Sequence, residues 1–215
     1  MIDPISPCSP HHCLAVILAG GQGKRLGGIS KNLISIRGKS ILQRQLDVTQ
    51  FLAHKTVLIG KANALPVLPK NIPNHHVQNF EVWTDLYDQS SPLSGIRTAL
   101  LLSPVPWVWV FAGDMPWITV ESCQNIVQHT VQYYKQHSTF PCITFYQDQH
   151  IHPLAALWHK HAFSYLPPIN ERHPPLKDLC KNMPHLSLSA PPPPVLYNIN
   201  TREDLQKATA FFIDT

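Results

Sequence analysis

Short apolar runs alternate with longer amphipathic stretches from Cys13 onward, and this alternation is typical of an α/β protein. The runs Leu14 to Ala19, Thr56 to Ile59 and Trp107 to Ala112 are apolar almost without interruption. Such runs have the form of strands that are buried on both faces of a parallel sheet. The pattern therefore predicts an α/β fold, with the third of these strands central in the sheet and parallel to its neighbours.

The amphipathic stretches predict the helices. Ser40 is the expected N-cap of a helix with one buried stripe, made of Ile41, Leu42, Leu46 and Phe51. Further helices are expected from Ser94 to Leu102, from Thr119 towards His137, and from Thr201 through Phe212.

Three shorter segments complete the predicted sheet. Strands are expected within 77–84, 142–146 and 154–158, with a polar turn between the last two. The sheet should therefore hold six or seven strands. The run Pro191 to Pro194 is expected to form a stiff connector before the last strand, and the alternative is a docking site for a partner domain.

Composition fits one folded domain. A chain of 215 residues that is 44% hydrophobic can bury a sizeable core. We expect residues 1–12 to be a flexible leader and residues 13–215 to be a single domain. The longest apolar runs are far shorter than the ~20 residues that a membrane span requires, and residues 1–13 lack the pattern of a secretory signal. Five scattered cysteines without a C-x-x-C pair favour a reducing, cytoplasmic setting.

Charge is concentrated in one part of the chain. The net charge is +4, yet the stretch between Asp3 and Asp47 has six basic residues and no acid. The rest of the chain has 11 basic and 13 acidic residues, a balance of −2. This distribution argues against a surface that coats nucleic acid and favours one local anion site.

A glycine-rich segment at the end of the first predicted strand lies within this basic stretch. It reads Leu18-Ala-Gly-Gly-Gln-Gly-Lys-Arg-Leu-Gly-Gly-Ile-Ser-Lys31. Its glycines allow backbone N–H groups to approach an anion closely, and Lys24, Arg25 and Lys31 supply positive charge. The composition is that of a phosphate-binding loop, although no Walker A motif closes it. A tight structural turn with solvated basic residues is the alternative.

Asp114 lies just past the carboxyl end of the predicted strand Trp107 to Ala112, after Gly113. Ligands of open parallel sheets bind at the carboxyl ends of the strands, so this carboxylate is expected beside the glycine-rich segment. A carboxylate oxygen there is a candidate ligand for a hard cation. A turn or N-cap role ahead of Thr119 is the alternative.

The glycine-rich segment resembles the signature loop of nucleotidyltransferases that use a nucleoside triphosphate, and it is most similar to that of the molybdenum cofactor guanylyltransferase family. The resemblance covers nearly the whole chain after Cys13. It continues in the segments 33–42, Ser91-Pro-Leu-Ser-Gly-Ile96, Ala112-Gly-Asp-Met-Pro116, His152-Pro153 and Asn198-Ile-Asn-Thr-Arg-Glu-Asp-Leu205.

This resemblance implies a three-layer α/β/α, Rossmann-like nucleotidyltransferase fold with a mixed, mainly parallel sheet of about seven strands. The implied activity is transfer of GMP from Mg-GTP to the terminal phosphate of molybdopterin, with release of pyrophosphate. Implied partners are therefore GTP and molybdopterin, together with other cofactor biosynthesis proteins or recipient apo-enzymes, but neither nucleic acid nor membrane.

The resemblance also implies roles for single residues. Arg25, Lys31 and Asp114 would be catalytic, and Asp114 with Asn200 would hold Mg²⁺. The nucleotide would be bound by a set comprising Leu18, Ala19, Gly20, Gly21, Lys31, Asp85 and Asp114.

Several of these assignments have structural alternatives. Asp85 would accept from guanine N1–H and N2–H, but an Asx turn competes with this role. Asn200 and Asn198 could instead form the turn that starts a helix at Thr201. His152 and Arg172 would contact the acceptor, whereas a packing role at a strand edge is the alternative for His152.

The chain also departs from the family pattern. The usual Asp-Lys of the loop is Ser30-Lys31, and the nucleotide-contacting asparagine after the second strand is replaced by Gly60, with Asn63 as a candidate substitute. These changes leave three alternatives open: a cytidylyltransferase for the same cofactor, a sugar-phosphate nucleotidyltransferase, and a catalytically silent nucleotide-binding module. The cluster Cys8-Ser-Pro-His-His-Cys13 lacks the spacing of a zinc finger, so we assign it no metal.

Overall fold

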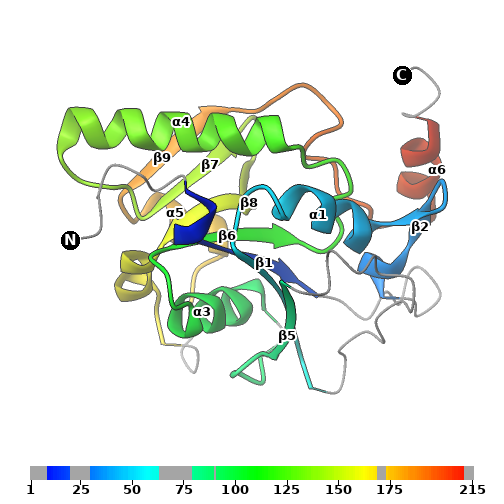
Figure 1. Cartoon of the computed structure of the whole chain (residues 1–215), viewed down its shortest axis with the longest axis horizontal. Helices are drawn as coiled ribbons and strands as arrows, with labels where there is room; N and C mark the ends of the chain where they lie inside the picture. Colours follow the sequence, from blue (N-terminus) through cyan, green and yellow to red (C-terminus); the bar gives the residue numbers. More distant parts are fainter. Residues whose placement is uncertain (1–8, 20–29, 63–78, 90, 169–172, 211–215) are drawn as a thin grey trace.

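The computed structural model describes residues 9–19, 30–62, 79–89, 91–168 and 173–210. In this part of the chain seven strands form one sheet in the order β5-β4-β1-β6-β8-β7-β9 (Figure 1). A separate antiparallel ribbon pairs β2 with β3. The strands are β1 (Cys13–Leu18), β2 (Ser35–Ile36), β3 (Lys39–Ser40), β4 (Lys55–Gly60), β5 (Phe80–Thr84), β6 (Trp107–Ala112), β7 (Ile143–Gln147), β8 (Ile151–His159) and β9 (His185–Ser189).

Helices cover both faces of the sheet, so the fold has three layers (Figure 1). One face carries α1 (Ile41–Thr49) and α4 (Val120–His137), and the other carries α3 (Pro92–Leu102) and α5 (Leu176–Lys181). The last helix, α6 (Arg202–Ala210), lies beside β2. The described ranges also contain the short 3₁₀ helices η1 (Pro10–His12), η3 (Lys31–Leu33) and η4 (Lys160–Tyr165). None of the helices in the described ranges combines the length and hydrophobicity that crossing a membrane requires.

The alternation of side chains along β1 explains why this strand is apolar throughout. Successive residues of a strand point to opposite faces. Leu14 and Val16 pack into the cluster under α3, whereas Ala15 packs into the cluster under α4 and Ile17 packs against Leu46 of α1. All six residues of β1 are buried, because both faces of the strand are covered.

The order of the strands creates a switch point beside β1. The chain runs from β1 to β4 and β5 on one side and then returns to β6 on the other side, and all these pairs are parallel. The connection that follows β1 therefore leads towards β4 on one side, whereas the connection that follows β6 leads towards β7 and β8 on the other side. Ligands of such sheets bind at this position.

The predicted α/β fold is confirmed, and several boundaries agree closely. The strand Trp107–Ala112 and the helix from Thr119 to His137 are found as expected. Ser40 and Thr119 both form capping boxes with the third residue of their helices. Thr201 precedes α6, and its hydroxyl accepts from the backbone N–H of Asp204.

Three expectations were wrong. Phe51 is 62% exposed, because α1 ends at Thr49 and its buried stripe stops before Phe51. Strand β6 is central but only half parallel, since it pairs antiparallel with β8. The segment Pro191 to Pro194 follows the last strand in the described residues, β9, rather than preceding it.

Candidate active site

The carboxyl ends of β1 and β6 are joined by a close backbone contact. The N–H of Gly113 donates to the carbonyl oxygen of Leu18 over 3.1 Å. A Cβ atom at residue 113 would lie 2.7 Å from this oxygen, so only glycine allows the approach. The contact aligns Asp114, the next residue, with the end of the strand that leads into the glycine-rich segment.

Asp114 is held from three directions by distant parts of the sequence. Its Oδ2 atom pairs with Lys31 Nζ at 3.0 Å, and its Oδ1 atom accepts from Asn198 Nδ2 at 2.9 Å. Its carbonyl oxygen accepts from the N–H of Ile199 at 2.9 Å, which docks the segment before α6 onto the end of β6. The side chains of Lys31 and Asp114 are only 18% and 15% exposed.

Lys31 also donates to Asn200 Oδ1, so its ammonium group contacts a carboxylate and an amide oxygen together. The family acid before this lysine is Ser30 here, and Ser30 Oγ donates to Asn32 instead. Orientation of Lys31 therefore comes from Asp114 and Asn200 rather than from its neighbour in sequence.

Asn200 is positioned by the start of α6. Asp204 Oδ2 accepts from the backbone N–H groups of Asn200 and Thr201, and Tyr197 donates its hydroxyl to Asp204 Oδ1. Burial raises the pKa of Asp204, but these hydrogen bonds outweigh that effect and its pKa lies below the usual value. The turn that caps the helix thus also places Asn200 beside Lys31. A role in starting the helix and a role in the candidate site are therefore compatible for this segment.

The oxygen atoms around Lys31 Nζ suit a hard cation. Asp114 Oδ2 and Asn200 Oδ1 already converge on one positive group. Mg²⁺ prefers oxygen ligands and is commonly bound by one or two carboxylates together with substrate phosphates. No group of three or more His, Cys, Asp or Glu side chains within the described ranges is placed to hold a metal. Asp114 and Asn200 are therefore the residues of this cluster that could hold a hard cation.

Asp85 lies at the same edge of the sheet, directly after β5. Its backbone N–H donates to Gly60 at the end of β4. Its Oδ1 atom accepts from Thr98 Oγ1 and from the N–H of Tyr87, while Oδ2 accepts from Ser94 Oγ and Lys61 Nζ. The Asx turn expected as an alternative is therefore present.

Sequence reasoning missed the partners of Asp85. Ser94 and Thr98 are spaced four residues apart on α3, so they share one helix face, and both are fully buried. Lys61 follows Gly60 directly, at the place where the chain departs from the family pattern. Two hydroxyl residues at this spacing on a mainly apolar helix were the sequence feature that could have indicated these partners.

The remaining predicted site residues are distributed as follows. Ala19 donates its N–H to Ile59 of β4, which keeps the start of the glycine-rich segment beside that strand. His152 lies at the start of β8, which extends past the end of β6, and its Nε2 is 3.3 Å from Asp148 Oδ2. Four predicted site residues, and the candidate substitute for the family asparagine, lie outside the described residues: Gly20, Gly21, Arg25, Arg172 and Asn63.

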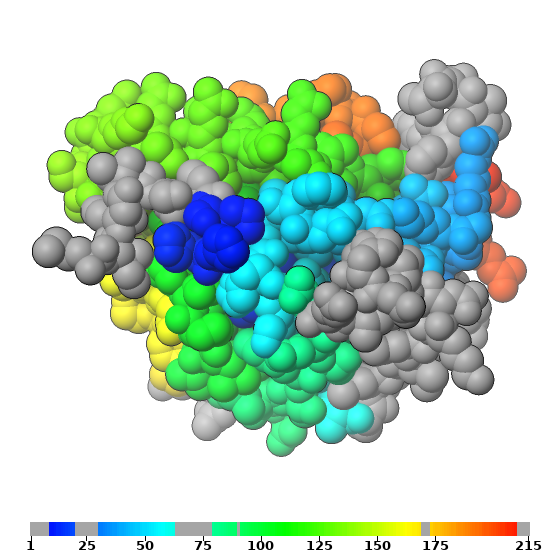
Figure 2. All heavy atoms as spheres, in the orientation of Figure 1, coloured from blue at the N-terminus to red at the C-terminus, as the bar shows by residue number. Residues whose placement is uncertain are grey.

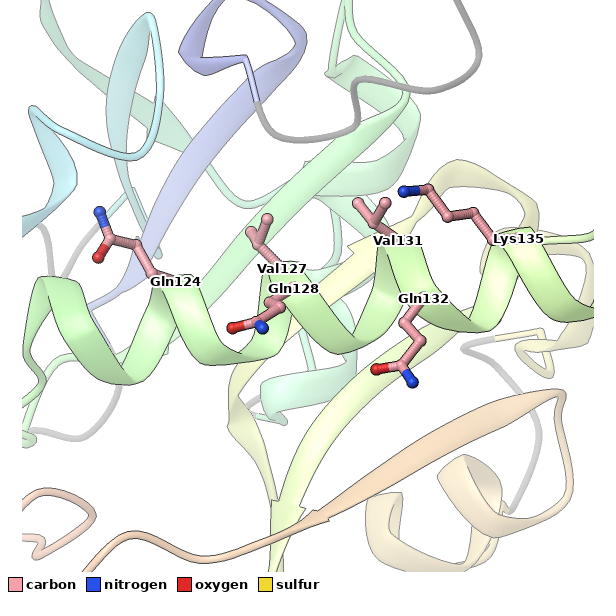
Figure 3. A pocket seen from close by; sticks show the side chains of 6 residues that line it. All are labelled: Gln124, Val127, Gln128, Val131, Gln132 and Lys135. Atoms are coloured by element: carbon pink, nitrogen blue, oxygen red, sulfur yellow. The ribbon is translucent and has the colours of Figure 1, made fainter.

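A separate hollow lies on the outer surface of α4 (Figure 3). It is lined by residues of that helix alone, namely Gln124, Val127, Gln128, Val131, Gln132 and Lys135. None of these is a predicted site residue.

The chain matches proteins of known family. Residues 15–185 match the MobA-like NTP transferase domain. A molybdenum cofactor guanylyltransferase of Vibrio cholerae is 30% identical over 194 residues, which cover 88% of each chain. A probable molybdenum cofactor guanylyltransferase of Methanosarcina acetivorans is 36% identical over 112 residues, covering 50% of this chain and 48% of that protein. The match thus spans about half the length of this archaeal relative.

Solved structures share the fold at low sequence identity. Molybdopterin-guanine dinucleotide biosynthesis protein A from Archaeoglobus fulgidus aligns with a TM-score of 0.63 at 19% identity, over 94% of this chain and 100% of that one. A 4-diphosphocytidyl-2C-methyl-D-erythritol synthase from Anaerococcus prevotii aligns with a TM-score of 0.64 at 11% identity, over 96% and 98% of the two chains.

The sheet order and the helices on both faces define the class of protein, a three-layer α/β domain with a polar cluster at the switch point of its sheet. Within this class, the match over residues 15–185 shows that the chain belongs to the family of MobA-like NTP transferase domains.

Proposed function

We propose that this protein transfers GMP from Mg-GTP to the terminal phosphate of molybdopterin, which forms the guanine dinucleotide cofactor and releases pyrophosphate. The observation that supports this most is the convergence of Lys31, Asp114 and Asn200 at the switch point of the sheet. The 30% identity to the Vibrio cholerae guanylyltransferase over most of both chains supports the choice of nucleotide and acceptor.

The proposed reaction is a displacement at phosphorus. An oxygen of the molybdopterin phosphate attacks the α-phosphorus of GTP, and the bond to the pyrophosphate oxygen breaks. The attacking phosphate is already anionic at pH 7, so positioning and charge stabilisation supply most of the catalysis. Bound Mg²⁺ would screen the negative charge of the triphosphate.

Residues of the chain have distinct proposed roles in this reaction. Lys31 donates to the phosphates and stabilises the charge that builds on pyrophosphate, together with Arg25 and the backbone N–H groups of the glycine-rich segment. Asp114 and Asn200 supply oxygen ligands for Mg²⁺. Asn198 orients Asp114, since its amide already donates to Oδ1. His152 and Arg172 are proposed to contact the acceptor, and Asp85 is proposed to lie at the end of the site that takes the base. A cytoplasmic location stays a prediction.

Pyrophosphate release tests this proposal. Protein incubated with Mg-GTP and molybdopterin should release pyrophosphate, and chelation of Mg²⁺ should abolish the release. Lys31→Ala and Asp114→Ala should each lower the rate about 100-fold or more, because each removes a charged group near the reacting phosphates. Lys39→Ala and Asp47→Ala are matched controls, since these residues form an ion pair elsewhere on the chain.

Three results would contradict the proposal. Release with CTP but not with GTP would reassign the nucleotide. Release with a sugar phosphate but not with molybdopterin would reassign the acceptor. Full activity in Lys31→Ala and Asp114→Ala would show that the reaction takes place elsewhere.

A further inference from the structure

The carboxylate of Asp85 is fully engaged by its own chain. Each of its oxygen atoms accepts two hydrogen bonds, from Thr98 and the N–H of Tyr87 on one side and from Ser94 and Lys61 on the other. Its side chain is only 6% exposed. A carboxylate offers about four acceptor directions, so a base could donate to Asp85 only by displacing one of these donors.

Lys61 is the accessible member of this group. Its side chain is 23% exposed, which is about four times the exposure of Asp85. Its ammonium group donates to Asp85 Oδ2 at 2.9 Å, to the carbonyl oxygen of Tyr87, and to Ser94 Oγ at 3.3 Å. The contact with Ser94 Oγ is long, and the hydroxyl of Ser94 also donates to Asp85 Oδ2 at 2.6 Å. A ligand with an acceptor atom can therefore replace Ser94 at the third N–H while the ion pair stays intact.

The position of Lys61 suits contact with a base, provided that the proposed function is correct. Lys61 follows β4, which lies directly beside β1, and Asp85 follows β5, one strand further out. Neighbouring strands are about 4.8 Å apart. A nucleotide whose phosphates lie at Lys31 and Asp114 would thus extend its base along the sheet edge towards Lys61. Gly95 at the start of α3 contacts Leu18, which links this group to the end of β1.

We propose that Lys61 reads the base by donating to guanine O6, and that Asp85 is a positioning residue that holds Lys61 in place. Guanine presents O6 and N7 as acceptors, whereas adenine presents an amino group at the position of O6. A fixed ammonium group therefore favours guanine over adenine. The N–H donors of Lys61 reach the base while the hydrogen bonds to the carboxylate of Asp85 stay in place.

Nucleotide analogues that differ at single atoms test this assignment. The 6-thio analogue of GTP keeps N1–H and the 2-amino group but has a weak acceptor in place of O6. The wild-type protein should prefer GTP over this analogue about tenfold in kcat/KM for pyrophosphate release, as expected for a hydrogen bond to a charged group. Lys61→Met should reduce this preference to less than twofold. ITP, which lacks only the 2-amino group, should be used by the wild type within about threefold of GTP.

Lys55→Met is the matched control. Lys55 is the first residue of β4, at the opposite end of the strand from Lys61, and it also forms an ion pair with an acid of β5, namely Glu81. This variant should keep the tenfold preference. Lys61→Leu, which also lacks a donor, serves as a second variant if Lys61→Met does not fold, and thermal unfolding tests whether each variant is folded.

Two patterns would overturn the assignment. An unchanged preference for GTP over 6-thio-GTP in the Lys61 variants would show that Lys61 does not contact O6. Rejection of ITP by more than tenfold would show that Asp85 itself reads the Watson–Crick edge. If the wild type turned over no nucleoside triphosphate, the proposed function would fail instead, and the same ratios would then be taken from equilibrium binding of GTP and its analogues.

Discussion

Leu18 is the residue at which the two halves of the candidate site meet. Its carbonyl oxygen accepts from Gly113 on the side of Asp114, and its side chain lies against Gly95 on the side of Lys61 and Asp85. A Cβ atom at Gly113 would lie 2.7 Å from the backbone oxygen, whereas one at Gly95 would lie 2.8 Å from the end of the Leu18 side chain. Two similar distances therefore have different consequences, because a side chain can move and a central strand cannot.

Substitution of each glycine by alanine should distinguish a contact with the backbone, at Gly113, from a contact with a side chain, at Gly95. Gly113→Ala should lower the free energy of unfolding by about 1–3 kcal/mol, because the end of β6 must move away from β1. It should also displace Asp114 and reduce pyrophosphate release at least tenfold. Gly95→Ala should be nearly neutral for stability, since Leu18 can change rotamer and alanine favours the helix by about 1 kcal/mol. Urea unfolding and the pyrophosphate assay measure both effects, and equal losses in the two variants would contradict this explanation.

Single residues of the site differed in how well the sequence predicted them. Asp114 could be placed because it lies just past the end of a strand, and Lys31 because it ends the glycine-rich segment. Lys61 could not, because a lysine after a strand is common on protein surfaces. Its importance depends on the buried hydroxyl groups of Ser94 and Thr98, which are more than 30 residues away in sequence.

The start of α6 connects secondary structure to the site. Asp204 satisfies the N–H groups of Asn200 and Thr201, which have no partner within the helix. The same contacts hold Asn200 against Lys31. A helix cap that would ordinarily contribute about 1 kcal/mol to stability thus also determines the geometry of a proposed metal ligand.

Asp204→Ala should therefore affect activity more than stability. We expect the free energy of unfolding to fall by about 1 kcal/mol, and pyrophosphate release to fall about tenfold because Asn200 is no longer held in place. Glu203→Ala is the control, since Glu203 lies in the same helical turn and is exposed. The rate of the Asp204 variant should recover in part at higher Mg²⁺ concentration. A rate like that of the Glu203 variant would show that Asn200 is not a ligand.

The sequence predicted the buried strands better than the edge strand β9 and the direction of β8. Buried strands such as β1 and β6 are apolar on both faces, so they stand out in the sequence. The weaker strand β9 was missed, because its residues alternate between half-buried and exposed positions at the edge of the sheet. The direction of β8 could not be read at all, since an apolar run does not show whether its partner is parallel or antiparallel.

The proposed site and an aromatic cluster lie at opposite ends of strand β6. The polar site lies at the carboxyl ends of β1 and β6, whereas Trp107, Phe140 and His159 pack together at the opposite end of β6. The space-filling view shows α1 (cyan) lying against α4 (green) at the surface (Figure 2). His159 Nδ1 accepts from the N–H of His161, which requires an unprotonated nitrogen. Burial, with His161 nearby, lowers the pKa of His159 to about 4.

This histidine should make stability depend on pH independently of the site. Between pH 6.5 and about 4 the unfolded chain binds a proton at His159 that the folded protein does not bind. The free energy of unfolding should therefore fall as the pH falls through this range, with a contribution of about 2 kcal/mol from this residue.

His159→Asn should flatten this dependence, because asparagine can still accept from the N–H of His161 but does not titrate. Urea unfolding at pH 7 and at pH 4.5 measures the difference. His150→Asn, at an exposed position in the turn between β7 and β8, should leave the pH dependence as it is in the wild type. An equal pH dependence in the wild type and the His159 variant would show that His159 is protonated in the folded state.

The sequence by itself determined the layered α/β architecture, the main strands and helices, and the residue types of a phosphate-binding site. Hydrophobic periodicity and turn-forming residues are local properties, so short segments of the sequence show them. Only the tertiary structure decided that Lys31 is held by Asp114 and Asn200, and that Asp85 is enclosed while Lys61 remains accessible. These contacts join residues up to 169 positions apart. They depend on the order and direction of the strands, which bring distant segments to the same edge of the sheet.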